Sequence, residues 1–218
     1  MVENFSWVTD KQDNFKEYVL NLPDDKVEEI LGAIPSGWNY PPKSHREFVK
    51  WLINRIKPKV TVELGVDYGY SSFLMSLCQD NPVYGIDCFD VSVHGPREDD
   101  DYQFVMSVKE KLGLDNLEII KGYFDDVAKS WDKEIDLLHI DGLHDYENCK
   151  NDCDTWAPLV KEDGVILFHD TVSNPDGAGL FFSQLEVPKV NFTNSFGLGV
   201  ASNNVDLIEE IKKEFNVE

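Results

Sequence analysis

Basic side chains are scarce in this chain of 218 residues, which has 20 lysines and arginines against 41 aspartates and glutamates. The formal net charge of −21 leaves no basic excess to neutralise a phosphate backbone, which argues against nucleic acid as a partner. No apolar run approaches the length of a membrane span, and the first residues lack the basic start and apolar core of a signal peptide. We therefore expect neither a membrane nor a nucleic-acid partner.

Cysteine is also rare, with four residues at positions 78, 88, 149 and 153. Cys149 and Cys153 would share one face of a helix, but no second pair stands at zinc-site spacing. This pattern favours reduced thiols in a cytoplasmic protein. The chain also lacks internal repeats and linkers, so we expect one domain: a helical cap over 1–43, a core over 44–203 and a C-terminal helix over 204–218.

What the chain does contain is a regular alternation of strand and helix patterns. Strands are expected at 60–64, 83–89, 117–121, 135–141, 165–170, 190–193 and 198–201. Helices are expected at 104–112, 146–159 and 205–215, a turn at 161–164 and a long exposed loop at 90–103. This order predicts an α/β fold, namely a Rossmann-like, doubly wound and mainly parallel seven-stranded sheet with an antiparallel C-terminal edge pair.

The first expected strand runs into a helix through a glycine-rich turn, a typical nucleoside cradle of doubly wound proteins. The spacing is Glu63-x-Gly65-x-x-x-Gly69 and differs from the dinucleotide pattern G-x-G-x-x-G. An acidic side chain before the turn suits a ligand with a cationic or hydroxyl-rich part, which points to S-adenosylmethionine (SAM). The glycines serve either a tight turn alone or a turn that a ligand approaches closely. Ser71, at the helix start, could donate to a ligand carboxylate or simply cap the helix.

Ligands of open α/β sheets bind beyond the carboxyl ends of the strands, where this chain places several acids and histidines. Asp87 closes the second strand and could accept hydrogen bonds from ribose hydroxyls, or could merely be a capping or solvated acid. Asp141 and Asp170 end neighbouring strands and could converge on one hard cation. His169, beside Asp170, could add a nitrogen ligand.

Two further histidines lie near the end of the fourth strand. His144 is on the loop after Asp141, where it could take a proton from a substrate hydroxyl, or could instead cap the next helix. His139 shares the strand face of Asp141, and we interpret it as a hydrogen-bonded core histidine.

Three segments together resemble the class I SAM-dependent methyltransferases, namely ELGVDYGYSS, GIDCFD and IDGLHDYENCKNDCDTWAPLVKEDGVILFHDT. Within that class they are similar to the small O-methyltransferase branch, the methyltransferase-24 group with catechol and macrocin-type enzymes. The resemblance covers about residues 44–201, and its last segment is the most specific.

The resemblance implies roles for individual residues. Glu63, Gly65 and Ser71 would line the methionine end of SAM, with Gly69 in the same turn and Asp141 nearby. Asp87 would hold the ribose, and Gly122 and Tyr123 would border the adenine. Asp141 and Asp170 would match metal-binding acids, and His144 would match the general base of the sugar-methylating members. Those members carry an acid where this chain has His169, so a dependence on Mg²⁺ or another divalent cation is left open.

The sequence therefore predicts transfer of a methyl group from SAM to a hydroxyl of a small molecule or glycan. Two other functions stay open. One is an NAD-dependent oxidoreductase, which shares the fold and the acid on strand two; the other is a non-catalytic SAM-binding protein. The identity of the acceptor, a homo-oligomeric state, and the roles of residues 1–40 and 90–103 do not follow from the residues.

Overall fold

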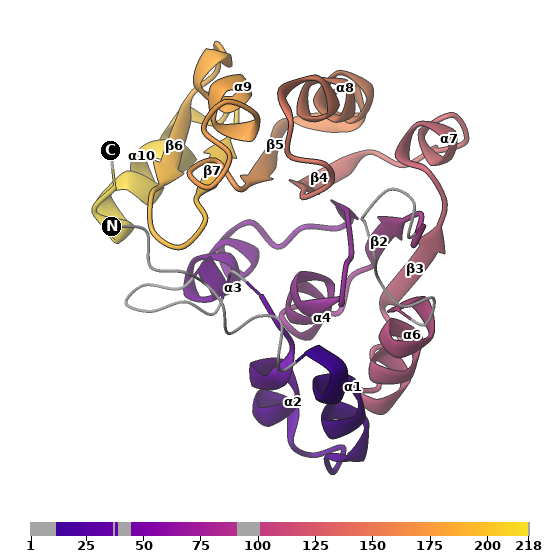
Figure 1. The fold of residues 1–218 in the computed structure, drawn as a ribbon. Coiled ribbons are helices and arrows are strands. Elements are labelled where there is room, and N and C mark those ends of the chain that lie inside the picture. Colours follow the sequence, from indigo (N-terminus) through magenta and orange to yellow (C-terminus); the bar gives the residue numbers. More distant parts are fainter. Residues whose placement is uncertain (1–11, 37, 39–44, 91–100, 218) are drawn as a thin grey trace.

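A computed structural model describes residues 12–36, 38, 45–90 and 101–217, and its centre is a seven-stranded sheet (Figure 1). The strand order is β3-β2-β1-β4-β5-β7-β6, in which the first five strands run parallel and β7 runs antiparallel to both of its neighbours. The strands are β1 (Thr61–Leu64), β2 (Val83–Asp87), β3 (Leu117–Lys121), β4 (Ile135–Ile140), β5 (Val160–His169), β6 (Lys189–Phe192) and β7 (Leu198–Ala201). The predicted α/β architecture with an antiparallel edge pair is confirmed.

Helices cover both faces of the sheet (Figure 1). One apolar core includes α1 (Gln12–Asn21), α2 (Val27–Ala33), α3 (His45–Ile56), α4 (Tyr70–Leu77), α6 (Asp101–Lys111) and α10 (Val205–Phe215). The other includes α7 (Phe124–Ala128), α8 (Tyr146–Trp156), the 3₁₀ turn η2 (Ala157–Leu159) and α9 (Ala178–Gln184). Because both faces are covered, consecutive strand residues such as Leu137 and Leu138 are buried in opposite cores.

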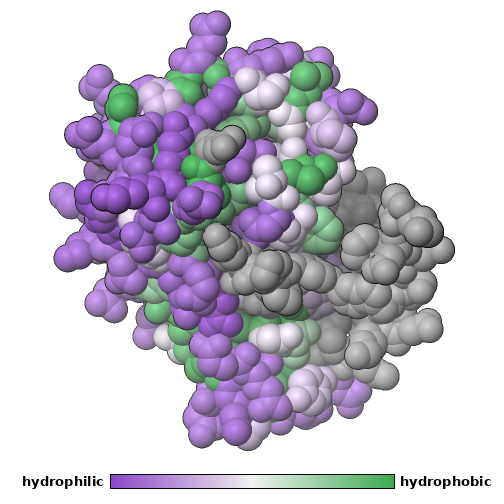
Figure 2. Space-filling model, turned by 90° about the vertical axis from the view of Figure 1, so that its left-hand side faces the viewer, coloured by the Kyte–Doolittle hydropathy of each residue, from purple (hydrophilic) through white to green (hydrophobic). Residues whose placement is uncertain are grey.

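The amphipathic patterns explain the helices that flank the sheet. In α3 the apolar residues Phe48, Val49, Leu52 and Ile53 recur at helical spacing and are all buried. Among the described residues, no helix has the length and apolar character that a membrane crossing requires. On the face in Figure 2, hydrophilic side chains predominate between scattered apolar ones, in keeping with the net charge of −21.

Several predicted boundaries need correction. Residues 161–164 are not a separate turn but part of β5, where the register jumps from Ile135 opposite Val160 to Leu137 opposite Val165. Four residues of β5 therefore lie opposite one residue of β4, which is an extended bulge. Strand β2 ends at Asp87 and not at residue 89, because Phe89 takes a positive φ of 49°.

Two more corrections concern helices. Helix α6 begins at Asp101, so residues 101–103 are helical and not loop, whereas residues 91–100 of the expected loop lie outside the described residues. Helix α8 ends at Trp156, and the chain continues through η2, in which Pro158 lacks the N–H that a longer helix needs. The pattern Ser44-x-x-Glu47 predicts a capping box at the start of α3, and Ser44 lies outside the described residues.

Candidate active site

The glycine turn between β1 and α4 brings the ends of three parallel strands together. Gly65 has a φ of +94°, and a Cβ atom there would lie 2.0 Å from the carbonyl oxygen of Asp141. Gly69 has a φ of +85°, and a Cβ atom there would touch the ring of Phe73. Only glycine permits this turn, because its conformation is left-handed and the end of β4 passes directly against it.

Asp87, at the end of β2, fixes the same turn from the other side. Its Oδ2 accepts hydrogen bonds from the backbone N–H of Val66 (2.9 Å) and Asp67 (3.2 Å), and its Oδ1 accepts one from Phe89 (2.7 Å). Asp87 is therefore both a structural residue of the turn and a cavity residue.

A cavity of about 450 Å³ lies above these strand ends. Of the residues singled out from the sequence, seven line it: Gly65, Ser71, Asp87, Asp141, His144, His169 and Asp170. Five do not: Glu63, Gly69, Gly122, Tyr123 and His139. Gly122 lies beside a separate surface hollow under α7, and the hydroxyl of Tyr123 donates to Asp90 (2.9 Å).

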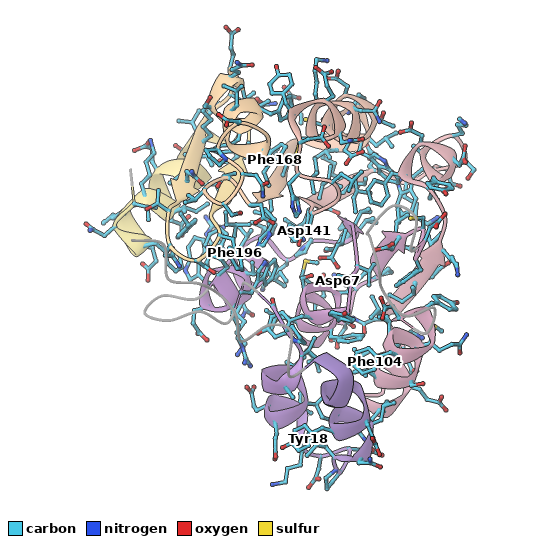
Figure 3. The ribbon with its side chains drawn as sticks, in the orientation of Figure 1. Tyr18, Asp67, Phe104, Asp141, Phe168 and Phe196 are labelled. Carbon is cyan, nitrogen blue, oxygen red and sulfur yellow. The ribbon has the colours of Figure 1, made fainter. Side chains whose placement is uncertain are left out.

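Sequence reasoning missed several residues of the cavity wall. Asp67, Tyr68 and Tyr70 lie on the glycine turn and the start of α4, whereas Trp38 and Phe196 come from distant segments. Figure 3 places Asp67, Asp141 and Phe196 in the middle of the molecule, where the cavity lies. Asp67 has a positive φ of 51°. Its place within the glycine turn is the sequence feature that could have marked it as a cavity residue. No local pattern marks Trp38 or Phe196.

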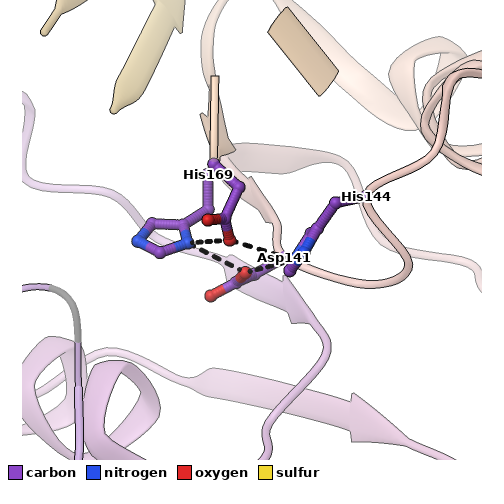
Figure 4. Close-up of side chains that lie close together, drawn as sticks. Asp141, His144 and His169 are labelled. Carbon is purple, nitrogen blue, oxygen red and sulfur yellow. Dashed lines mark hydrogen bonds and ion pairs between the residues drawn. The ribbon is translucent and has the colours of Figure 1, made fainter. Parts of the chain in front are cut away.

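Four ionisable side chains meet at the ends of β4 and β5 (Figure 4). His144 Nε2 lies 3.2 Å from Asp141 Oδ1 and 3.1 Å from Asp170 Oδ2. His169 Nδ1 lies 3.2 Å from the same oxygen of Asp141 and 2.7 Å from that of Asp170. Two carboxylate oxygens and two imidazole nitrogens thus form one compact cluster, which we call the Asp–His cluster.

Electrostatics couple the members of the Asp–His cluster. Burial alone would lower the pKa of His169, but the charges and hydrogen bonds of Asp141 and Asp170 raise it to about 10. Burial would likewise lower the pKa of His144, yet the two carboxylates raise it above its ordinary value. The histidines in turn outweigh burial and hold the pKa of Asp141 well below its usual range, and that of Asp170 below it. The cluster therefore stabilises an added positive charge.

The donor set of the Asp–His cluster fits a divalent metal ion. One ligand atom from each of the four residues lies within 4.8 Å of all the others. Around an ion with bonds of about 2.0–2.2 Å, neighbouring ligand atoms are separated by roughly 3 Å, as they are here. A donor set of imidazole nitrogens and carboxylate oxygens suits Zn²⁺, Mn²⁺ or Fe²⁺ better than it suits Mg²⁺, which prefers ligands that are all oxygen.

Glu63 and His139 lie beneath the cavity and are fully buried. His139 Nδ1 donates to Glu63 Oε1 (2.8 Å), and Glu63 also accepts a hydrogen bond from the hydroxyl of Ser72. The interpretation of His139 as a hydrogen-bonded core histidine agrees with this contact. The Glu63 carboxylate is thus occupied by partners from β4 and α4.

The fold is that of class I SAM-dependent methyltransferases. Residues 62–171, half of the chain, match the methyltransferase domain family, and the chain belongs to that family. The uncharacterized protein y4gI of Sinorhizobium fredii is 30% identical over 166 residues, which are 72% of this chain and 18% of that protein. The chain therefore spans less than a fifth of this relative.

Solved structures also share the fold. An O-methyltransferase from Bacillus cereus in complex with SAH (S-adenosylhomocysteine) is 16% identical with a TM-score of 0.61, covering 90% of this chain and 94% of that one. The O-methyltransferase TomG from Streptomyces achromogenes in complex with SAM is 14% identical with a TM-score of 0.59, covering 91% and 93%. At such identities the likeness is one of fold.

Proposed function

We propose that the protein transfers the methyl group of SAM to a hydroxyl of a small molecule or glycan. The observation that carries this proposal is that one cavity joins the glycine turn, Asp87 and the Asp–His cluster. Family membership and the SAM-bound and SAH-bound structures of similar fold support it.

The cofactor would occupy the part of the cavity above the glycine turn. Asp87 would accept the ribose hydroxyls, and Ser71, near the start of α4, would donate to the methionine carboxylate. The acidic wall formed by Asp67 and Asp141 suits the positive sulfonium and amino groups of SAM. Gly122 and Tyr123 follow β3, whose end is bonded to Asp87, and the proposal keeps them beside the adenine.

The acceptor would lie on the side of the Asp–His cluster. SAM carries an already activated methyl group, so transfer requires an oriented acceptor oxygen and a destination for its proton. His144 is one-third exposed, and its ring lies between two carboxylates that stabilise the imidazolium, which suits it to take that proton. A divalent ion on Asp141, His169 and Asp170 would lower the pKa of the acceptor hydroxyl. The bond from sulfur to the methyl carbon breaks, a bond from oxygen to that carbon forms, and SAH remains.

Methyl transfer from isotope-labelled SAM to a panel of hydroxylated acceptors tests the proposal. We expect label in at least one acceptor, with an equal amount of SAH formed. SAM binding without transfer across catechols, phenols and sugars would favour a non-catalytic SAM-binding protein. Binding of NAD with no binding of SAM would contradict the proposal and favour the oxidoreductase.

A further inference from the structure

Buried ring nitrogens beneath the cavity have no hydrogen-bond partner among the described residues. They are Nε2 of His139, Nε2 of His169 and Nε1 of Trp38. The ring of His139 adjoins the other two: its centre lies 6.1 Å from that of His169 and 5.1 Å from that of Trp38. Leaving such an atom unpaired costs about 1–3 kcal/mol, so three in one place call for a shared explanation.

The hydrogen-bond roles of these nitrogens are complementary. His139 Nδ1 donates to the Glu63 carboxylate, and in the tautomer that makes this contact Nε2 is the ring atom that carries the lone pair. His169 turns Nδ1 toward Asp141 and Asp170, so its Nε2 points away from the carboxylates. A histidine that binds a metal through one ring nitrogen carries its proton on the other, and that N–H needs an acceptor.

Direct bonding between the two histidines is ruled out by geometry. A ring nitrogen lies about 1.1 Å from the ring centre, so rings 6.1 Å apart keep their nitrogens at least about 3.9 Å from each other. One water molecule can bridge nitrogens up to about 5.6 Å apart, twice an ordinary hydrogen-bond length, and the indole N–H of Trp38, whose ring adjoins His139, is a further donor for such a water. A buried water with two to four polar partners is a normal part of protein structure.

On these grounds we propose that Glu63 and His139 are positioning residues of the candidate metal centre, acting on His169 through one buried water. The chain of contacts runs from Ser72 and Glu63 to His139, to the water and to His169. It fixes the ring orientation and tautomer of His169, which leaves Nδ1 free for the ion. The inference rests on the metal part of the proposed function, and it gives Glu63 a role at the metal centre beneath the cofactor cavity.

His45 is the rival partner for His169. Its ring is also 6.1 Å from that of His169, and its Nδ1 is buried without a partner among the described residues. Its Nε2, however, bonds only to the backbone carbonyl of Asn194 (3.2 Å), whereas His139 is held by a carboxylate. In addition, one ligand atom each of Glu63, His139 and Asp141 lies within 4.8 Å of the others, which places His139 next to the cluster itself.

Titration of the full chain with Mn²⁺ alone, read by electron paramagnetic resonance, tests the proposal, with SAH affinity and thermal unfolding measured in parallel. His139→Phe keeps an aromatic ring against Trp38, but it leaves the buried Glu63 carboxylate with one hydrogen-bond partner fewer. The double variant Glu63→Gln/His139→Phe also removes the charge of that carboxylate. We expect Mn²⁺ affinity to fall about 10- to 100-fold in the double variant, with SAH affinity within about twofold of wild type. The matched variant His45→Phe should keep both affinities.

Four results would overturn the inference. One is a folded double variant that binds Mn²⁺ as tightly as wild type, and another is an equal loss in His45→Phe. A third is a wild-type protein that binds SAH but no Mn²⁺, which leaves the SAM part of the proposed function standing. A fourth, a wild-type protein that binds neither, removes the proposed function together with the inference.

Discussion

Asp141 lies one residue beyond β4 and belongs to two groups of side chains, one with His144, His169 and Asp170, the other with Glu63 and His139. Its backbone carbonyl also passes against Gly65 of the glycine turn. The residue therefore adjoins the proposed cofactor region, the candidate metal centre and the buried histidine beneath both. Substitutions at single residues around it can separate these roles.

Replacement of His144 by alanine should lower turnover by about 10²-fold or more, because the acceptor proton would lose its destination. SAM and SAH affinities should stay near those of wild type, since the proposed cofactor contacts come from the glycine turn and Asp87. Single-turnover methyl transfer and SAH titration measure the two quantities. Unchanged turnover would remove His144 from the mechanism, and a parallel loss of Mn²⁺ affinity would make it a ligand.

Asp152, on α8, should make stability depend on pH. Burial, together with the charge of Asp125, raises the pKa of Asp152 to about 7. Above about pH 4 the unfolded chain has lost the proton of Asp152, whereas the folded protein retains it up to about pH 7. This carboxyl group therefore destabilises the folded protein increasingly as pH rises from about 4 to about 7, and the destabilisation is complete above about pH 7. Asp152→Asn should therefore raise Tm by roughly 5 °C at about pH 8.5, with a smaller gain at about pH 5.5.

The exposed Asp154, on the same helix, supplies the control for Asp152. Asp154→Asn removes the same charge from the surface, where water screens it, and should show no comparable dependence on pH. Thermal unfolding of both variants and wild type across this pH range is the measurement. A gain for Asp152→Asn that does not grow with pH would contradict the assignment.

Among the secondary-structure elements, periodicity was enough to predict the seven strands and the helices α6, α8 and α10. It did not reveal that β5 starts at Val160, since residues 161–164 are polar and form the bulge between Val160 and Val165, which pair with Ile135 and Leu137 of β4. The ends of strands predicted the Asp–His cluster. The placement of Trp38 and Phe196 in the cavity wall depends on long-range packing, which no local pattern records.

Two glycine substitutions test how strictly the elements are positioned. Gly65→Ala places a Cβ atom against the backbone of Asp141, at a position where φ is positive, and neither backbone segment can move away. The substitution should therefore destabilise the fold by more than about 2 kcal/mol and abolish SAH binding. Gly32→Ala, within α2, meets nothing within 4 Å and should stabilise by roughly 0.5–1 kcal/mol. Chemical denaturation measures both; an unaffected Gly65→Ala variant would contradict the close approach.

At the scale of the whole molecule, the net charge of −21 is the dominant feature of the composition. The acidic excess favours a neutral or cationic acceptor over a polyanion, because a cavity with Asp67, Asp87, Asp141 and Asp170 in its wall attracts positive charge. The excess negative side chains also repel one another in the folded protein, which lowers its stability.

Salt should accordingly stabilise the protein. Raising NaCl from about 20 mM to about 300 mM shortens the screening length and weakens repulsion between surface carboxylates, so Tm should rise by a few degrees. Thermal unfolding at fixed pH measures the change. A fall in Tm would indicate that surface ion pairs such as Arg55–Glu210 outweigh the repulsion.

Calorimetric titration of the purified protein with SAM and with SAH, each in the presence of Mg²⁺ and of EDTA, tests the central claim most directly. We expect saturable binding of both ligands in both conditions, because the proposed cofactor contacts come from the glycine turn, Ser71 and Asp87 and not from a metal ion. Absence of binding to either ligand by folded protein would contradict it.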